Sequence, residues 1–312
     1  MTVQIPILNG IYVDQVAEFR TSYPRNLVPF PKQTGISDGF LAPADGLQKD
    51  GDGPGLDRGA FNWKGELYRV MGTKLCRIAA SNSITVLGDV GGAGPVTMDE
   101  SFDVLGIVSN GRLWYWDGAA LTALTDPDAG TVIDARWIAG YWLITDGETI
   151  AVTELNDRYA VNPLKYGSAE ADPDPVMAVD ELRNEAYALG RYTIEAFQNV
   201  GGTNFPFRRI DGALVTRGVI GTHAYCQIGS TFAFLGSGKG EAPGFYLMAS
   251  GDSQKLSTAE IDKILSGYTE AQLSSVVVEK RVYENHSSLL IHLPDQCWVY
   301  DLSASSATGE PV

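Results

Sequence analysis

The sequence predicts an all-β fold, a β-propeller-like series of repeated hairpins or blades with one short helical insert and an extended N-terminal arm. Three observations support this prediction. Short hairpin patterns recur along the chain at intervals of roughly 30 to 60 residues. The composition, with 35 glycines, 15 prolines and only 20% charged residues, suits many short strands joined by tight turns. One segment alone has a clear helical periodicity.

The stretch DVLGIVSNGRLWYWDG (103–118) is the clearest hairpin. Asn110-Gly111 separates two runs of β-forming residues, and this dipeptide favours a type I′ turn because both positions adopt positive φ. The spacing predicts strands over 104–108 and 113–116. Both arms are apolar on both faces, so we expect this hairpin to lie between neighbouring sheets.

Five further segments repeat the pattern of two β-rich runs around a small or turn residue. They are 66–78, 134–155, 184–201, 231–251 and 288–301. Propeller blades repeat at about 40 to 50 residues, so the spacing favours a propeller over a stack of sandwiches, which would show similar hairpins. The number of blades stays open at this point.

The helical insert is LSTAEIDKILSGYT (256–269). Ser257 followed by Glu260 predicts a capping box, and Gly267 stands where a C-cap glycine belongs. The apolar side chains at helical spacing are Ile261, Ile264, Leu265 and Tyr268. A short amphipathic helix covering the β core is therefore expected, and the residues after it begin with possible further helix before a strand.

The N-terminal region divides from the rest by composition. Residues 20–60 are dense in Pro, Gly and Asp and hold few strand-length runs, which indicates an extended arm across the surface. We expect this arm to be ordered and packed, because its apolar residues are costly to leave in water; these are Leu27, Val28, Phe30, Phe40 and Leu41. The predicted division is an arm over 1–60 and a β domain over 61–312, truncated at its C-terminal end.

The charge balance argues against a protein that wraps nucleic acid. The net charge is -15, whereas wrapping nucleic acid requires a basic surface.

Cys76, Cys226 and Cys297 are few and far apart, so we expect buried reduced thiols rather than a disulfide framework or a zinc site. The start of the chain lacks a signal-peptide pattern, and no apolar run of about 18 residues predicts a membrane span.

Several short motifs resemble ligand sites but lack the required context. GSGKGE (236–241) is followed by a strand instead of a helix, which favours a hairpin loop over a phosphate-binding loop. The acidic runs at 50–53, 126–130 and 171–175 do not match a calcium loop and are ordinary turn or linker material. The three histidines, His223, His286 and His292, lack ligand spacing. No catalytic, cofactor-binding or metal residue is therefore predicted.

Carboxylates and tryptophans support the main alternative, a carbohydrate-binding or glycan-cleaving propeller. Acidic residues at the expected blade entrances are Asp99, Glu100, Asp103 and Asp134, and a sugar could stack on Trp114, Trp116, Trp137 or Trp142. The chain has no Ser-x-Asp-x-Gly-x-x-Trp box, which a sialidase-like propeller should carry. We therefore expect the aromatic side chains to fill the gaps between blades and the protein not to be an enzyme.

The order of several segments carries a family resemblance. The segments are LYRVMGTKLCRI, LGDVGGAGPVTM, VLGIVSNGRLWYWDG, STAEIDKILSGYT and LLIHLPDQCWVYDLSAS, preceded by RNLVPFPKQ in the arm. Together they resemble the packaged DNA stabilisation, or tail accessory hub, proteins of short-tailed phages of the lambdoid Salmonella type. No single segment is diagnostic, because each is strand and turn material.

The resemblance implies an architectural role in the virion tail, after assembly in the host cytoplasm. Such proteins form a ring, understood as a homohexamer, beneath the portal and its adaptor ring. They help to close the channel after packaging and present surfaces for the tail needle and tailspikes. The acidic composition suggests that DNA passes without sticking. Family members continue well beyond the SASSATGEPV at which this chain stops, so we expect ring-forming and partner surfaces to be missing.

Overall fold

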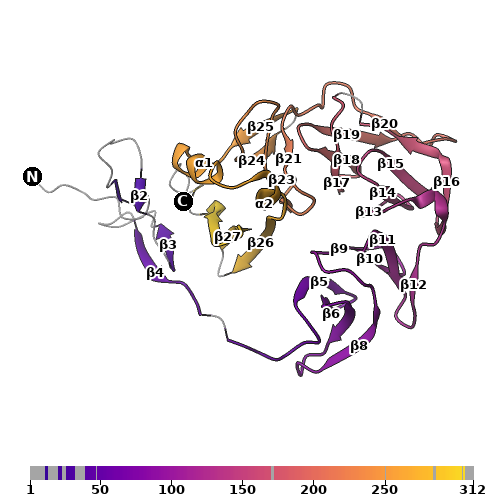
Figure 1. Cartoon of the computed structure of the whole chain (residues 1–312), viewed down its shortest axis with the longest axis horizontal. Coiled ribbons are helices and arrows are strands. Elements are labelled where there is room, and N and C mark those ends of the chain that lie inside the picture. The colour runs from indigo at the N-terminus through magenta and orange to yellow at the C-terminus, as the bar shows by residue number, and fades with distance from the viewer. Residues whose placement is uncertain are drawn as a thin grey trace, which may run out of the picture.

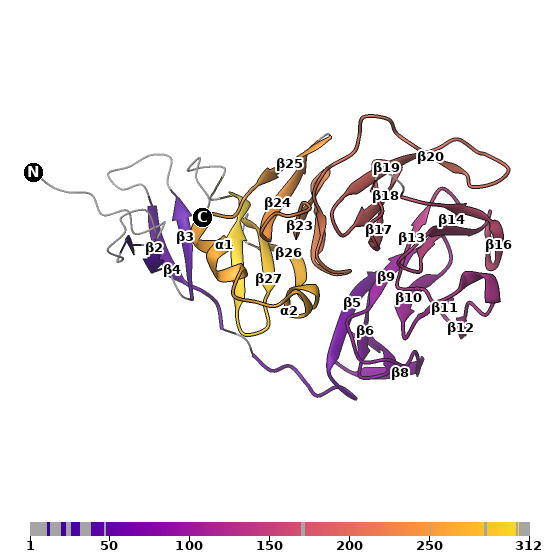
Figure 2. The same ribbon diagram turned by 45° about the horizontal axis from the view of Figure 1, so that its top comes forward.

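Six β-sheets follow one another around an axis in the computed structural model (Figure 1). The structure describes residues 11–12, 20–22, 26–31, 39–46, 48–169, 172–249, 251–283, 286–303 and 305. Each sheet is built from consecutive antiparallel strands, and its first strands lie nearest the axis, as the turned view also shows (Figure 2). This is a six-bladed β-propeller, and the all-β propeller prediction is confirmed.

The first three blades have four strands each. Blade 1 consists of β5 (Asp57–Trp63), β6 (Glu66–Met71), β7 (Lys74–Ile78) and β8 (Ile84–Asp89). Blade 2 consists of β9 (Thr97–Glu100), β10 (Leu105–Ser109), β11 (Arg112–Trp116) and β12 (Leu121–Ala123). Blade 3 consists of β13 (Asp134–Ile138), β14 (Tyr141–Thr145), β15 (Ile150–Glu154) and β16 (Asp157–Gly167), after a 3-10 turn, η2 (Pro127–Ala129).

The last three blades differ in strand number. Blade 4 consists of β17 (Val176–Leu182), β18 (Glu185–Gly190), β19 (Ile194–Asn199) and β20 (Phe207–Arg209). Blade 5 consists of β21 (Gly218–Val219), β22 (Tyr225–Ile228), β23 (Thr231–Ser237), β24 (Gly244–Ala249) and β25 (Asp252–Lys255). Blade 6 has three strands, β26 (Val277–Tyr283), β27 (His286–His292) and β28 (Cys297–Asp301).

Each of the six predicted hairpins falls in a different blade. In the hairpin of blade 2, Val108 pairs with Leu113 and Ser109 with Arg112. The turn residues Asn110 and Gly111 have φ of 54° and 71°, as a type I′ turn requires. The first strand ends one residue later and the second begins one residue earlier than predicted, because Ser109 and Arg112 still pair across the turn.

Apolar cores lie between successive blades rather than within them. Five separate clusters of buried side chains join blades 1 and 2, 2 and 3, 3 and 4, 4 and 5, and 5 and 6. Trp142 of blade 3 shows the closeness of this packing, because a Cβ added to Gly106 of blade 2 would lie 2.3 Å from its ring. Trp116 and Trp142 are buried between blades, as predicted for the hairpin aromatics.

The helical insert is α1 (Ala259–Leu265), and a second short helix, α2 (Glu270–Ser274), follows it where further helix was expected. Leu265 and Leu273 enter the core between blades 5 and 6. The predicted capping box was wrong. Thr258 is the N-cap of α1 and makes no side-chain cap hydrogen bond; the capping box is that of Thr269 and Gln272 in α2.

Gly267 directly follows the C-cap residue Ser266, which is the position predicted for a cap glycine. Its φ is not positive, however, so it does not form the left-handed cap. Ser257 is engaged elsewhere, because its hydroxyl accepts a hydrogen bond from the backbone N–H of Phe245 and donates one to Asp262.

The described part of the arm contains two small hairpins on the side of blade 6 (Figures 1 and 2). They are formed by β1 (Ile11–Tyr12) with β2 (Arg20–Ser22) and by β3 (Leu27–Pro31) with β4 (Gly39–Pro43). The first blade begins at Asp57, and the division at residue 60 stays a prediction. In the described ranges, neither α-helix reaches the length of a membrane-spanning helix.

Candidate functional site

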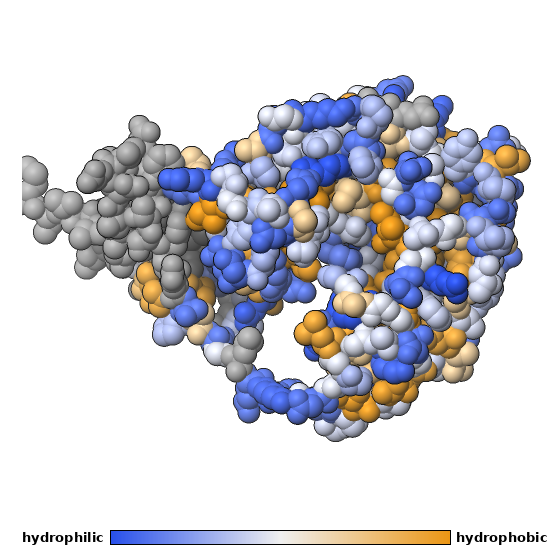
Figure 3. All heavy atoms as spheres, in the orientation of Figure 1, coloured by the Kyte–Doolittle hydropathy of each residue, from blue (hydrophilic) through white to orange (hydrophobic). Residues whose placement is uncertain are grey.

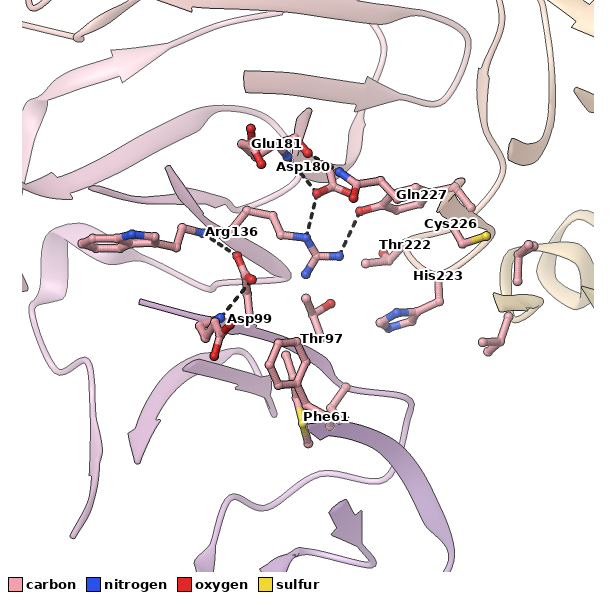
Figure 4. Close-up of a pocket in the computed structure, with 17 residues that line it drawn as sticks. Phe61, Thr97, Asp99, Arg136, Asp180, Glu181, Thr222, His223, Cys226 and Gln227 are labelled. Carbon is pink, nitrogen blue, oxygen red and sulfur yellow. Dashed lines mark hydrogen bonds and ion pairs between the residues drawn. The ribbon is translucent and has the colours of Figure 1, made fainter. Parts of the chain in front are cut away.

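The candidate site is a cavity of about 580 Å³ on the axis of the propeller. Segments from all six blades line it, so it is the axial channel of the ring. Figure 4 shows its polar side chains converging from different strands. The ionisable lining residues are Asp99, Glu100, Arg136, Asp180, Glu181 and His223. Four carboxylates against one guanidinium make the wall acidic.

Arg136 extends across the channel and joins three blades (Figure 4). Its Nε donates to Asp180 Oδ1 of blade 4 at 3.0 Å, and its Nη2 donates to the Tyr225 hydroxyl of blade 5 at 3.3 Å. Burial opposes the charged form, but the surrounding phenol and carboxylates raise the pKa of Arg136 well above its ordinary value. The guanidinium is therefore a permanent cross-link of the channel wall.

Two carboxylates connect the inner strand of one blade to the next. Asp99 Oδ2 of β9 accepts a hydrogen bond from the backbone N–H of Trp137 in β13 at 2.7 Å. Asp134 Oδ2 of β13 accepts one from the N–H of Val179 in β17 at 2.9 Å. Burial raises the pKa of both carboxyls, that of Asp134 to about 6. Their positions suit a structural role, since each accepts a backbone hydrogen bond from the next blade.

Of the four carboxylates predicted at blade entrances, only Asp99 and Glu100 line the channel. Asp134 is fully buried, and Asp103 pairs with Arg158 Nη1 at 2.6 Å. The lining carboxylates Asp180 and Glu181 were missed, as was Arg136. A signal existed, because the same Asp-Glu dipeptide occurs at 99–100 and at 180–181.

Two of the three histidines are hydrogen-bonded, and the third, His223, is half-buried in the channel wall. Burial, with a smaller effect of the Arg136 charge, lowers the pKa of His223 to about 4, so this channel residue is neutral at pH 7. His286 Nδ1 lies 2.5 Å from Asp301 Oδ2, and His292 Nε2 lies 3.1 Å from Glu279 Oε2. Each pair links neighbouring strands of blade 6.

The loop motifs contain ion pairs and turn hydrogen bonds. In the 236–241 loop, Glu241 forms a bidentate pair with Arg217, and Lys239 pairs with Asp172. In the 126–130 turn, Asp126 accepts hydrogen bonds from the backbone of Asp128 and, at 3.0 Å, of Val161.

The other acidic runs are also paired. Lys49 pairs with Asp52 in the 50–53 run. Asp174 of the 171–175 run accepts from the backbone of Tyr192 and Thr193. Nowhere in the described ranges do three His, Cys, Asp or Glu side chains gather as metal ligands.

Two predictions about individual side chains need correction. Cys297 is exposed and Cys226 half-buried, whereas only Cys76 is fully buried as expected. Burial raises the pKa of all three thiols, that of Cys226 to about 12. Trp137 does not simply fill a gap between blades, because it lines the channel. The exposed Phe102 ring lies nearly perpendicular to it, with the ring centroids 5.8 Å apart.

Comparisons with known proteins agree with this architecture. The profile of the family described as "Bacteriophage P22 Gp10, beta-propeller" matches residues 3–312. Tail hub protein gp10 of Salmonella phage P22 is 29% identical over 323 residues, which cover 97% of this chain and 67% of that protein.

Two solved structures of low sequence identity match part of this chain. The extracellular domain of a hybrid two-component system of B. thetaiotaomicron matches with a TM-score of 0.50 at 8% identity, over 78% of this chain and 32% of that one. PorZ, a surface component of the type-IX secretion system of Porphyromonas gingivalis, has a TM-score of 0.48 at 13% identity, over 78% and 31%. The chain thus spans about a third of either protein. With a family profile that matches nearly its whole length, the chain belongs to the P22 Gp10 family of phage tail hub proteins with a β-propeller fold.

Proposed function

We propose that the chain is a structural virion protein that closes the portal channel after packaging and retains the DNA. The match to a tail hub protein over 97% of the chain is the observation that carries this proposal. In this role the protein lies beneath the portal and its adaptor ring and provides attachment for the tail needle and tailspikes. It assembles in the host cytoplasm as a homohexamer and ends in the virion tail.

The chemistry of the channel supports a mechanical role rather than a catalytic one. A glycosidase needs one carboxylate to protonate the leaving group and a second as nucleophile or base. Here Asp180 is bonded to a guanidinium, and Asp99 and Asp134 are each bonded to a backbone N–H. These side chains hold blades together, and the protein is accordingly not an enzyme in this proposal.

The size of the channel decides where DNA would pass. A cavity of about 580 Å³ is on the scale of a small-molecule pocket, and Arg136 crosses it. A duplex would therefore run along the axis of the assembled ring of copies and not through one propeller. The net charge of -15 makes that lumen repel DNA, so that the genome slides without adhering.

The test uses DNA-filled phage heads assembled without this protein. Heads incubated with the purified chain are expected to keep their DNA protected from added nuclease, whereas untreated heads lose it. Failure of the chain to bind the heads or to protect their DNA would contradict the proposal. In filter binding at low salt the chain alone should retain little DNA; tight, salt-sensitive retention would contradict the repelling lumen.

A further inference from the structure

The hairpin β3–β4 of the arm has a composition that does not suit a solvent-exposed element. All ten residues of its two strands are nonpolar, LVPFP in β3 and GFLAP in β4. Phe30 and Phe40 are directly paired, and their rings stack at 5.2 Å. None of the side chains described in the hairpin is buried, and Leu27 and Phe40 are 40% and 47% exposed. Two-stranded hairpins are marginal alone, and exposed apolar patches mark contact surfaces.

One contact shows which surface is complementary to this hairpin. The Phe30 ring lies edge-on to the His286 ring of blade 6, with centroids 4.9 Å apart. The Asp301 carboxylate holds that imidazole at 2.5 Å, so the ring is presented in a fixed orientation. The same end of blade 6 has further exposed apolar side chains, Val282 at 64% and Tyr283 at 49%.

The connection between the hairpin and the propeller does not fix the hairpin to its own chain. Every described residue from 44 to 56 is exposed. Figure 3 shows this linker along the outer rim of a hollow between blades 1 and 6. Extended at about 3.3 Å per residue, such a linker spans roughly 40 Å. The hairpin can therefore reach blade 6 of a neighbouring copy.

We propose that β3–β4 is an exchange arm, which in the assembled protein docks on blade 6 of a second copy of this chain. Each copy offers the same His286 surface, so a contact made within one chain can also be made between chains. Because the donor hairpin and the acceptor blade are different surfaces, the contact runs head to tail and can close into a ring. Strands β3 and β4 carry no charged side chain, so they can join copies that repel each other through their net charge of -15.

The decisive experiment cross-links two variants in a Cys226→Ser, Cys297→Ser background. One copy carries Ala42→Cys in β4 and the other Ser288→Cys in β27, which leave the Phe30 and His286 rings in place, and the mixture is treated with a bis-maleimide. We expect a covalent product of two chains from the mixture and from neither variant alone. The double variant Ala42→Cys, Ser288→Cys is the comparison. If it cross-links only within single chains and the mixture gives no two-chain product, the arm stays on its own chain and the proposal is wrong.

A second measurement is the mass of the full chain by light scattering over a range of concentrations. Phe30→Ser should reduce the assembled mass to that of one chain, whereas Phe102→Ser, which removes an 84% exposed ring on blade 2, should leave it unchanged. Equal assembly of Phe30→Ser and the wild type, or a wild type that stays a single chain throughout, would overturn the proposal. DNA retention by phage heads is not part of either readout, so failure of the exchange arm is distinguishable from failure of the hub role.

Discussion

Five of the six blade interfaces are closed in the same way, and the sixth is different. Each of the five closed interfaces has an apolar core and a hydrogen bond between the inner segments of its two blades. Those bonds run from Val96 N to Arg58 O, Trp137 N to Asp99 Oδ2, Val179 N to Asp134 Oδ2, Gln227 Nε2 to Glu181 O, and Val278 N to His223 O. Between blades 6 and 1 the described strands show neither a shared core nor such a bond.

The two kinds of interface also differ in exposure. In β17, which lies between closed interfaces, five of seven residues are buried, whereas in β26 every residue from Glu279 to Tyr283 is exposed. All strands of blade 1 precede all strands of blade 6 along the chain, and no strand is shared between them. The ring is thus held by contacts between sequence neighbours, and its two ends are free to be joined by other means. Variants at the closed interfaces should therefore behave differently from variants at the open interface between blades 6 and 1.

The largest expected difference is between the two faces of blade 1. Leu75 faces blade 2 and is fully buried, while Leu67 lies on the opposite face and is 36% exposed. Leu75→Ala should lower the free energy of unfolding by about 2–5 kcal/mol, because it removes buried area and leaves a cavity. Leu67→Ala should lower it by less than about 1 kcal/mol. Urea unfolding of both variants measures this difference, and similar losses would mean that the sixth interface is closed in solution.

The stability contributed by the closed interface between blades 3 and 4 should depend on pH. Burial raises the pKa of Asp134 to about 6 from its ordinary 3.8, so the folded state binds the proton more tightly than the unfolded chain. The contribution of Asp134 is therefore full below about pH 4 and lost as the pH rises through about 6. A shift of about two pKa units corresponds to about 3 kcal/mol. Relative to Asp134→Asn, the wild type should lose roughly this stability between pH 4 and 7.

Asp103→Asn is the matched control for that pH series. Although burial opposes it, hydrogen bonds from Arg158 and Ser101 lower the pKa of Asp103, so its contribution is lost as the pH falls. The difference between wild type and Asp103→Asn should therefore change with the opposite sign. If the Asp134 and Asp103 curves ran in parallel, the carboxylate of Asp134 would not be a buried link between the blades.

A smaller effect is expected at Arg58, which joins blades 1 and 2 without a carboxylate partner. Its guanidinium is 7% exposed and donates to the carbonyls of Gly72, Gly91 and Gly94 and to Ser109 Oγ. Arg58→Met removes these hydrogen bonds, leaves the carbonyls of Gly72 and Gly94 without this donor, and should cost about 1–3 kcal/mol in unfolding free energy. Arg77→Met, which removes an exposed pair with Glu66, should cost less than about 1 kcal/mol. Equal losses in thermal or denaturant unfolding would argue against this role of Arg58.

Local features were predictable from the sequence, whereas contacts between blades were not. The turn at Asn110-Gly111 follows from its own dipeptide, and the six hairpins gave one blade each. The hydrogen bond from Trp137 to Asp99 connects residues 38 positions apart, which no local pattern specifies. Asp99 and Asp134 could therefore be considered as acids of the alternative, a glycan-cleaving propeller, although both accept hydrogen bonds from the backbone of the next blade.

The position of the helix capping box could not be predicted from the sequence either, although its residues are close together in the chain. Ser257 and Glu260 have the spacing of a capping box, as do Thr269 and Gln272. Only the second pair forms one, because Ser257 is bound by the backbone N–H of Phe245 from the neighbouring strand. Tertiary contacts thus decided between two equivalent sequence patterns.

The smallest expected effect lies at the open interface itself. Asp57 raises the pKa of Arg69 through a hydrogen bond, and Glu279 of blade 6 adds a weaker effect from across the opening. A double-mutant cycle of Arg69→Met and Glu279→Gln should give a coupling energy below about 1 kcal/mol that vanishes at high salt, because both side chains are exposed to water. Coupling well above 1.5 kcal/mol and insensitive to salt would show that the two side chains meet in a dry contact. In that case blades 6 and 1 close on each other in solution, and the free end of the ring would not be available to join copies.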